Sequence, residues 1–78
     1  MRIQEIITEL KANPSNVKFS RLCRICDHFF GEARQSGTSH RVYKTPWKGD
    51  PRVNIQKKGN KAKAHQVRQV IKGLKKLE

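Results

Sequence analysis

The sequence has few acidic residues and no long apolar segment. Six Asp and Glu residues stand against 18 Lys and Arg, so the 78-residue chain has a formal net charge of +12. A surplus this large favours a polyanionic partner, and nucleic acid is the commonest one. No apolar run approaches the roughly 18 residues that cross a bilayer, which excludes a membrane-spanning segment.

The first residues also lack the apolar core of a signal peptide, because Arg2 and Glu5 are charged. We therefore expect a cytoplasmic protein. The basic residues are spread over helical, loop and strand-like segments, whereas membrane-surface helices carry theirs opposite a bulky apolar face. No membrane partner is expected. A chain this short forms one domain, 1–78, with a thin core, so its functional site should be a surface groove or an exposed side chain.

Cysteine is scarce, and both cysteines lie in one Cys-x-x-Cys motif, Cys23 and Cys26, followed by His28. In a reducing compartment two cysteines do not form a disulfide framework. A zinc site is disfavoured because both cysteines share the apolar stripe of a predicted helix, whereas His28 lies on its opposite side. We interpret the cysteines as core residues, with redox chemistry as the alternative, and predict no metal and no cofactor.

Three segments have the apolar period of a helix. They are 2–12, which Pro14 ends, 18–30, which Gly31 follows as the expected C-terminal cap, and 62–77. Their apolar stripes are formed by Ile3, Ile6, Ile7 and Leu10, by Phe19, Leu22, Cys23, Cys26, Phe29 and Phe30, and by Val67, Val70, Ile71 and Leu74. Opposite these stripes lie Arg21, Arg24 and His28 in the second helix and His65, Arg68, Lys72 and Lys76 in the third.

The central part of the chain has the pattern of strands. Residues 52–56 alternate polar and apolar side chains, 39–45 contain Val42 and Tyr43, and 32–36 indicate a short first strand. Turn-forming residues fill 45–51 and should join two strands as an antiparallel pair. The predicted order is α-α-β-β-β-α. The fold class is α+β, with helices on one face of a three-stranded antiparallel sheet.

Two features point to nucleic-acid contact. The segment 57–63 is a basic loop before a helix start, where ammonium groups and free backbone N–H groups attract phosphate. Its cations are Lys57, Lys58, Lys61 and Lys63, and the alternative is a merely solvated loop. Trp47, beside Lys44 and Lys48, either stacks on a base or covers the edge of the core. No helix-turn-helix or zinc-finger pattern indicates DNA reading.

The segment 36–44 holds the best candidate for a catalytic residue, His40. It follows a glycine turn at the start of a predicted strand, with Arg34, Arg41 and Lys44 nearby. Imidazole titrates near neutral pH, so it can move a proton on or off a ribose hydroxyl. Adjacent cations can stabilise the phosphate charge that develops during transfer. His28 and His65, on polar helix faces, are weaker candidates.

The run Gly37-Thr38-Ser39-His40-Arg41-Val42-Tyr43-Lys44, then Val53-Asn54-Ile55 and the basic segment before the last helix, resembles the HicA family of mRNA interferase toxins. The resemblance covers 17–76 and implies a double-stranded-RNA-binding-like α-β-β-β-α fold whose first helix is 17–30. Residues 1–14 would be an additional helix serving as core cover, dimer contact or antitoxin contact. The 46–51 loop is a further departure that would adjust substrate choice.

The resemblance implies that His40 is the catalytic residue of a metal-independent mRNA endoribonuclease. The RNA-binding residues would be Arg34, Ser39, Arg41, Lys44, Trp47, Lys57, Lys58, Lys61 and Lys63. A second proton carrier is not identified, and Tyr43 and water are the candidates. A HicB-type antitoxin would cover His40 and associate fast if acidic. The alternatives are a non-catalytic module that reads A-form RNA shape and an adaptor bound to a ribosome or polymerase.

Overall fold

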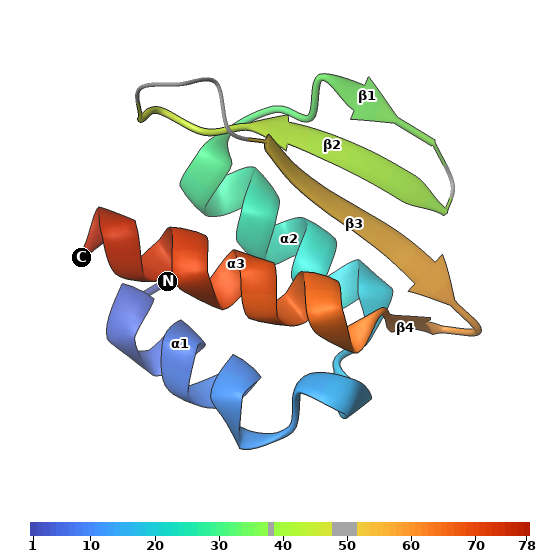
Figure 1. Ribbon diagram of the computed structural model, residues 1–78, viewed down its shortest axis with the longest axis horizontal. Coiled ribbons are helices and arrows are strands. Elements are labelled where there is room, and N and C mark those ends of the chain that lie inside the picture. The colour runs from blue at the N-terminus through green and yellow to red at the C-terminus, as the bar shows by residue number, and fades with distance from the viewer. Residues whose placement is uncertain (38, 48–51) are drawn as a thin grey trace.

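The computed structural model describes residues 1–37, 39–47 and 52–78, and there the chain forms helices and an antiparallel sheet (Figure 1). The elements in chain order are helix α1 Ile3–Ala12, the 3₁₀ turn η1 Pro14–Asn16, helix α2 Phe19–Phe30, strands β1 Gln35–Ser36, β2 His40–Lys44, β3 Arg52–Lys58 and β4 Lys61–Ala62, and helix α3 Ala64–Leu77. The predicted order α-α-β-β-β-α is confirmed, with the turn η1 and the short strand β4 as additions. Thr38 and residues 48–51, most of the predicted 45–51 turn, lie outside the described residues.

The sheet has the strand order β1-β2-β3-β4, and each neighbouring pair is antiparallel. In the central pair His40 lies opposite Gln56, and Lys44 lies opposite Arg52. The prediction of three antiparallel strands is correct for β1 to β3. The short strand β4 adds a fourth member at the edge, where Lys57 lies opposite Ala62.

The interpretation of 57–63 as a loop before a helix is wrong. Strand β3 continues to Lys58, Gly59 and Asn60 make a two-residue turn, and Lys61 returns as β4. Helix α3 therefore begins at Ala64 rather than at residue 62. The sequence misled here because lysine, glycine and asparagine are typical of loops, whereas cross-strand pairing decides whether they form a hairpin.

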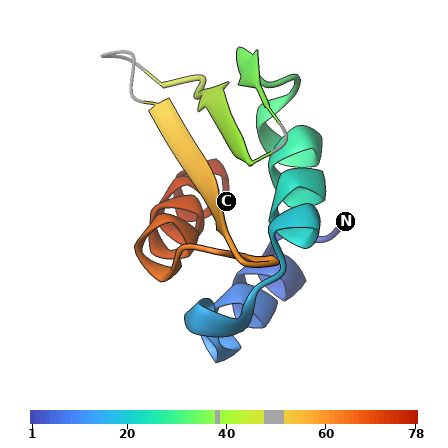
Figure 2. The same cartoon turned by 90° about the vertical axis from the view of Figure 1, so that its right-hand side faces the viewer.

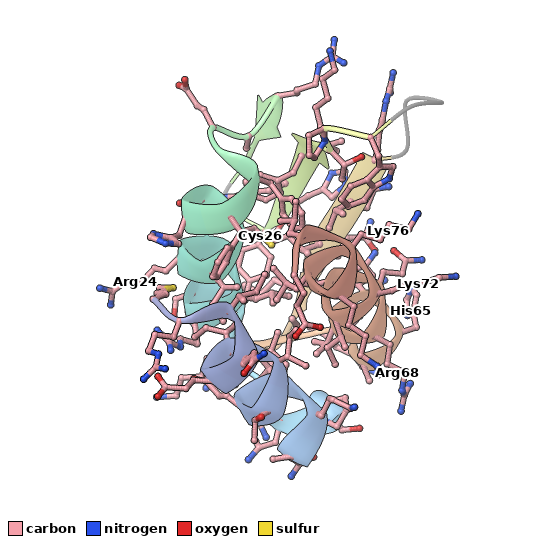
Figure 3. The ribbon with its side chains drawn as sticks, turned by 90° about the vertical axis from the view of Figure 1, so that its left-hand side faces the viewer. Arg24, Cys26, His65, Arg68, Lys72 and Lys76 are labelled. Atoms are coloured by element: carbon pink, nitrogen blue, oxygen red, sulfur yellow. The ribbon has the colours of Figure 1, made fainter. Side chains whose placement is uncertain are left out.

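Helices α2 and α3 lie side by side under one face of the sheet and enclose the core (Figures 1 and 2). The stripes predicted for the second and third helices face inward, and Leu22, Cys26, Val67 and Leu74 are fully buried. Figure 3 shows Cys26 between the two helices, with Arg24 on the outer side of α2. Gly31 caps α2 with a φ of 84°, a conformation that favours glycine.

Helix α1 forms a third layer beneath α2 and α3, and it packs mainly on α3 (Figure 1). It lies on the helix side of the sheet, with α2 and α3 between it and the strands (Figure 1). Its side chains Ile6, Ile7 and Leu10 are buried in the common core. Arg21 of α2 holds the Glu9 carboxylate with two hydrogen bonds of 2.9 and 2.8 Å. Of the roles open for this helix, the structure supports core cover.

The prediction that the two cysteines are core residues is confirmed. Cys23 and Cys26 are free thiols and both are buried. Desolvation raises the pKa of both thiols, which keeps them protonated and poor nucleophiles. Within the described residues, no group of three or more His, Cys, Asp and Glu side chains could hold a metal ion.

A test of the third layer is the substitution Leu10→Ala. Leu10 is fully buried between α1 and the rest of the core. Its truncation should lower the free energy of unfolding by about 2–5 kcal/mol, through lost burial and a cavity. Urea denaturation followed by circular dichroism measures this loss. Gln4→Ala, at an exposed position of α1, is the control and should change stability by less than about 0.5 kcal/mol. Equal effects would mean that α1 is not part of the core.

Candidate nucleic-acid interface

One end of the molecule gathers the start of β2, the end of β3, β4 and the N-termini of α2 and α3 (Figure 2). The contacts that hold these ends together include the bridge between Lys18 and Lys61, the bond from the Phe19 N–H to the Asn60 carbonyl (3.1 Å), and the bond from the Lys63 N–H to the Gln56 carbonyl (3.2 Å). We call this region the basic end. Its members are Lys18, His40, Lys57, Lys58, Lys61, Lys63 and His65.

Three lysines of the basic end stand in a row. Lys58 lies opposite Lys61 across the β3–β4 pair, and Lys18 forms an isolated bridge with Lys61 on the other side. All three are exposed, and none forms an ion pair within the described part of the chain. Like charges that lie directly opposite each other destabilise a sheet. A bound polyanion would remove this repulsion.

His40 is the first residue of β2, and its side chain points away from the helices. Successive strand residues point to opposite faces, and the neighbouring Arg41 and Tyr43 contact Asp27 of α2. His40 is half-buried, and its carbonyl accepts the Gly37 N–H at 2.8 Å. Across the strand pair it faces Gln56.

The surroundings of the His40 ring are open and cationic. Lys58, two residues beyond Gln56 in β3, is its diagonal neighbour on the same face, within reach of a long side chain. In the described ranges the His40 ring makes no hydrogen bond or ion pair with protein groups. The ring is therefore available to a ligand that approaches the basic end over the outer face of the sheet.

Arg41 and Tyr43 of β2 lie on the face of the sheet that is turned toward the helices. The fully buried Tyr43 donates a 2.6 Å hydrogen bond from its hydroxyl to the Asp27 carboxylate. Arg41 donates from Nη1 to both Asp27 oxygens (3.3 and 3.2 Å) and to the Tyr43 hydroxyl oxygen (3.4 Å). Burial, followed by the bond to Asp27, raises the pKa of Tyr43. The structure thus places Tyr43 on the far side of the strand from His40, where it cannot relay a proton to a substrate at that ring.

The structure brings some of the sequence-predicted residues together and separates others. Ser39, Lys57, Lys58, Lys61 and Lys63 lie at the basic end with His40 (Figure 1). Lys44 is the last residue of β2, at the opposite end of the strand from His40, and Trp47 follows it. Arg34 is exposed beside the β1 edge, where its N–H donates to the Val42 carbonyl at 2.7 Å. Arg41 faces the helices.

Trp47 packs on the molecule rather than projecting from it. Its ring meets Phe30 edge to face, with 6.3 Å between centroids, and Lys76 Nζ lies 4.9 Å from the Trp47 ring centroid. A Cβ at Gly73 would lie 3.1 Å from Phe30 Cζ and 3.3 Å from Trp47 Cη2, so glycine permits this close approach. These contacts support the interpretation of Trp47 as a cover for the edge of the core.

Two cationic contributions were missed in the sequence. Lys18 appeared only as the start of a helix, and its place beside Lys61 depends on a bridge between residues 43 positions apart. His65 appeared on a polar helix face as a weaker catalytic candidate, and its place in a groove lined by Lys58 and Lys63 was not foreseen. No local pattern could have found these neighbours.

The basic charge continues along α3. Figure 3 shows His65, Arg68, Lys72 and Lys76 on one outer flank of this helix, and all four are exposed. The polar face predicted for the third helix is therefore confirmed. Both α2 and α3 begin at the basic end, so the positive ends of their dipoles add to its potential.

No protein-family model, curated protein or solved structure matches this chain. None of the described helices is long and apolar enough to cross a membrane. The resemblance to the HicA family therefore rests on the sequence motifs at 37–44, 53–55 and 57–63 alone, and the function must be argued from the residues of the basic end.

The contact between β2 and α2 can be tested with Tyr43→Phe, which removes only the hydroxyl. At pH 7 the free energy of unfolding should fall by about 1–3 kcal/mol, the usual contribution of a hydrogen bond to a charged group. The raised pKa of Tyr43 means that only the unfolded chain releases the phenol proton just above pH ~10. The difference between wild type and variant should therefore shrink above this pH. Denaturant titrations between pH 7 and 11 measure it.

The matched background for this experiment is Asp27→Ala, which removes the nearer acceptor of the Tyr43 hydroxyl (2.6 Å) and leaves the Cys23 carbonyl at 3.4 Å. In that background Tyr43→Phe should have a clearly smaller effect, because the hydroxyl has lost its charged partner. An equal loss of stability in both backgrounds would contradict the Tyr43–Asp27 bond as the source of the effect.

Proposed function

We propose that this protein is an RNA-binding toxin of a toxin–antitoxin pair, similar to HicA, and a metal-independent mRNA endoribonuclease that uses His40. The observation that carries the proposal is the position of His40. Its half-buried ring, without a protein partner in the described residues, sits on the outer face of the sheet in the basic end. A nucleic-acid backbone drawn to the lysines would pass next to this ring.

Binding follows from the charge distribution. The row of Lys18, Lys58 and Lys61 presents three ammonium groups without carboxylate partners in the described chain. Phosphate groups on a polynucleotide would replace repulsion between lysines by attraction, and release counterions. The contacts are to backbone phosphates, so they position the strand without reading its sequence. Such binding suits a cytoplasmic protein that acts on mRNA.

The chemistry needs only RNA's own nucleophile. His40 accepts the proton of a ribose 2′-OH while the 2′-oxygen attacks the adjacent phosphorus. The P–O5′ bond breaks, the 5′-oxygen takes a proton from water, and the products are a 2′,3′-cyclic phosphate and a 5′-hydroxyl. Lys58, the diagonal neighbour of His40, stabilises the negative charge that builds up on the phosphate oxygens.

The same surface suits an inhibitory partner of the HicB type. An acidic antitoxin protein would be attracted to the +12 chain and would cover His40 together with the lysine row. Charge complementarity of this kind speeds association and makes it sensitive to salt.

A non-catalytic RNA-binding module is the second candidate. One observation favours it: within the described residues His40 has no hydrogen-bonded partner that would orient its ring, as a catalytic base often has. Both candidates share the basic end, so cleavage and binding must be measured separately.

The direct test is cleavage of a mixed-sequence RNA by the purified protein in EDTA, with wild type and His40→Ala compared. Removal of a general acid–base group should slow cleavage by roughly 10²–10⁴-fold. The products should carry 2′,3′-cyclic phosphate ends. His28→Ala is the matched control, because His28 is exposed near the other end of α2, and it should cut at the wild-type rate.

Binding measured at low salt completes the test, and His40→Ala should bind RNA about as tightly as wild type. If wild type binds RNA but never cuts it, the non-catalytic module is correct and the toxin proposal is wrong. Equal cleavage by wild type and His40→Ala would place the catalytic group elsewhere.

The salt dependence of RNA affinity tests the lysine row. For single-stranded RNA the slope of log K against log salt is about −0.7 per neutralised phosphate. The double variant Lys58→Ala, Lys61→Ala should therefore have a slope shallower by about 1.4. Arg2→Ala, a charge loss at the far end of the chain (Figure 1), should leave the slope unchanged. Salt-insensitive association with ribosomes or polymerase, and none with RNA, would favour the adaptor.

A further inference from the structure

A groove opens on the helix side of the sheet, between the first two turns of α2 and the strands β2 and β3. Four cations line it, Lys18, Arg24, Arg41 and Lys57, and its floor includes Cys23 and Asp27. The groove lies on the opposite face of β2 from His40, because Arg41 follows His40 in the strand. Two of its lining residues, Arg41 and Ser20, each have an N–H group without an acceptor among the described residues.

The first feature is the Arg41 guanidinium. Its Nη1 is used by Asp27 and by the Tyr43 hydroxyl. Its Nε is buried and has no hydrogen-bond partner within the described residues. A buried donor without an acceptor is costly. The Nε edge of a guanidinium offers two parallel N–H groups, which match two oxygens of a phosphate.

The second feature is the start of α2, which has no side-chain cap. The Phe19 N–H is taken by the Asn60 carbonyl and the Leu22 N–H by the Lys18 carbonyl. Between them, the Ser20 N–H has no acceptor among the described residues, and Ser20 lines the groove. Free N–H groups and the positive dipole end attract anions.

Asp27 is the one acidic group in the groove lining. It does not oppose an anion as a free carboxylate would, because both oxygens accept from Arg41 and one also accepts from Tyr43. Asp27 instead holds Arg41 by Nη1. Besides Arg41, the groove lining contains three cations, Lys18, Arg24 and Lys57, and no carboxylate other than Asp27.

We infer that this groove binds a phosphate group of an RNA strand, held by the Nε edge of Arg41, the Ser20 N–H and the charges of Lys18, Arg24 and Lys57. That the phosphate belongs to RNA rests on the proposed function. Since His40 and Arg41 are consecutive residues on opposite faces, an RNA strand that crosses this end of the sheet contacts both. The groove then anchors a phosphate beyond the one at His40.

The test uses the full-length protein and a 2′-O-methyl RNA oligonucleotide, which cannot be cut because its 2′-hydroxyl is blocked. The NMR signal of the Arg41 Nε–H should move on titration with this oligonucleotide. Arg24→Ala, at an exposed helix position, should weaken binding about three- to tenfold, as expected for the loss of one phosphate contact. Arg2→Ala, with the same change of charge, should bind like wild type.

Arg41→Lys separates shape from charge. It keeps the positive charge but loses the paired N–H groups, so it should weaken oligonucleotide binding by at least as much as Arg24→Ala. Because Arg41 also contacts Asp27, a melting curve first confirms that this variant is folded. If Arg41→Lys does not fold, the binding of Arg24→Ala, which breaks no described contact, decides whether the groove binds RNA.

Three outcomes would overturn the inference. In the first, the Arg41 Nε–H signal does not move and Arg24→Ala binds RNA like Arg2→Ala, while His40→Ala still loses cleavage. The groove would then not be part of the RNA site, although the proposed function would stand. The signal moves with inorganic phosphate but not with the oligonucleotide, which makes the site one for free phosphate. The signal moves only with an acidic peptide, which makes the groove a protein contact.

Discussion

The pairing of β2 with β3 is the constraint on which the rest of this protein depends. Its register places Tyr43 opposite Val53 and Arg41 opposite Ile55, so these four side chains face the helices. The alternate residues, with His40 among them, face outward. A shift of the register by one residue would exchange the two sets and expose the core. The same pairing therefore builds the core on one face and the proposed catalytic position on the other.

Charge is the second constraint, and it acts against stability. The chain carries +12, and much of this charge belongs to the lysines of the basic end and to one flank of α3, where Figure 3 shows Arg68, Lys72 and Lys76. Self-repulsion destabilises a compact state, and a small domain has little stability to lose. Helix α1 adds the buried side chains of Ile6, Ile7 and Leu10 to the core. Its third layer offsets part of this cost without occupying the basic surface.

The contact among Asp27, Arg41 and Tyr43 links the core to the charged surface. The Tyr43 ring belongs to the core, and its hydroxyl holds Asp27, which in turn holds one end of the Arg41 guanidinium. Arg41, whose side chain is 29% exposed, is therefore oriented by the exposed Asp27 carboxylate and by the hydroxyl of the buried Tyr43. A guanidinium fixed in this way loses less side-chain entropy on meeting an anion than a free lysine would. This held guanidinium distinguishes Arg41 from Lys58 and Lys61, which form no ion pair within the described residues.

Much of the fold could be predicted from the sequence, because its determinants are local. The apolar periods of the three helices, the alternation of β3 and the cap at Gly31 need only neighbouring residues, and all appear in the structure. The positive charge and the burial of Cys23 and Cys26 were also foreseeable, since they follow from composition and from the stripe of one helix.

The arrangement of the candidate site was decided by tertiary structure alone. The strand β4 forms because Lys61 pairs with Lys58. The lysine row forms because Lys18, from a distant part of the chain, makes a β-bridge with Lys61. His40 and Arg41 are adjacent in sequence yet serve opposite faces, while Lys44 and Trp47 lie away from them. Periodicity determines which side of an element is apolar. Only packing determines which polar sides meet, because charged side chains remain solvated in many arrangements and their own sequence pattern does not choose among them.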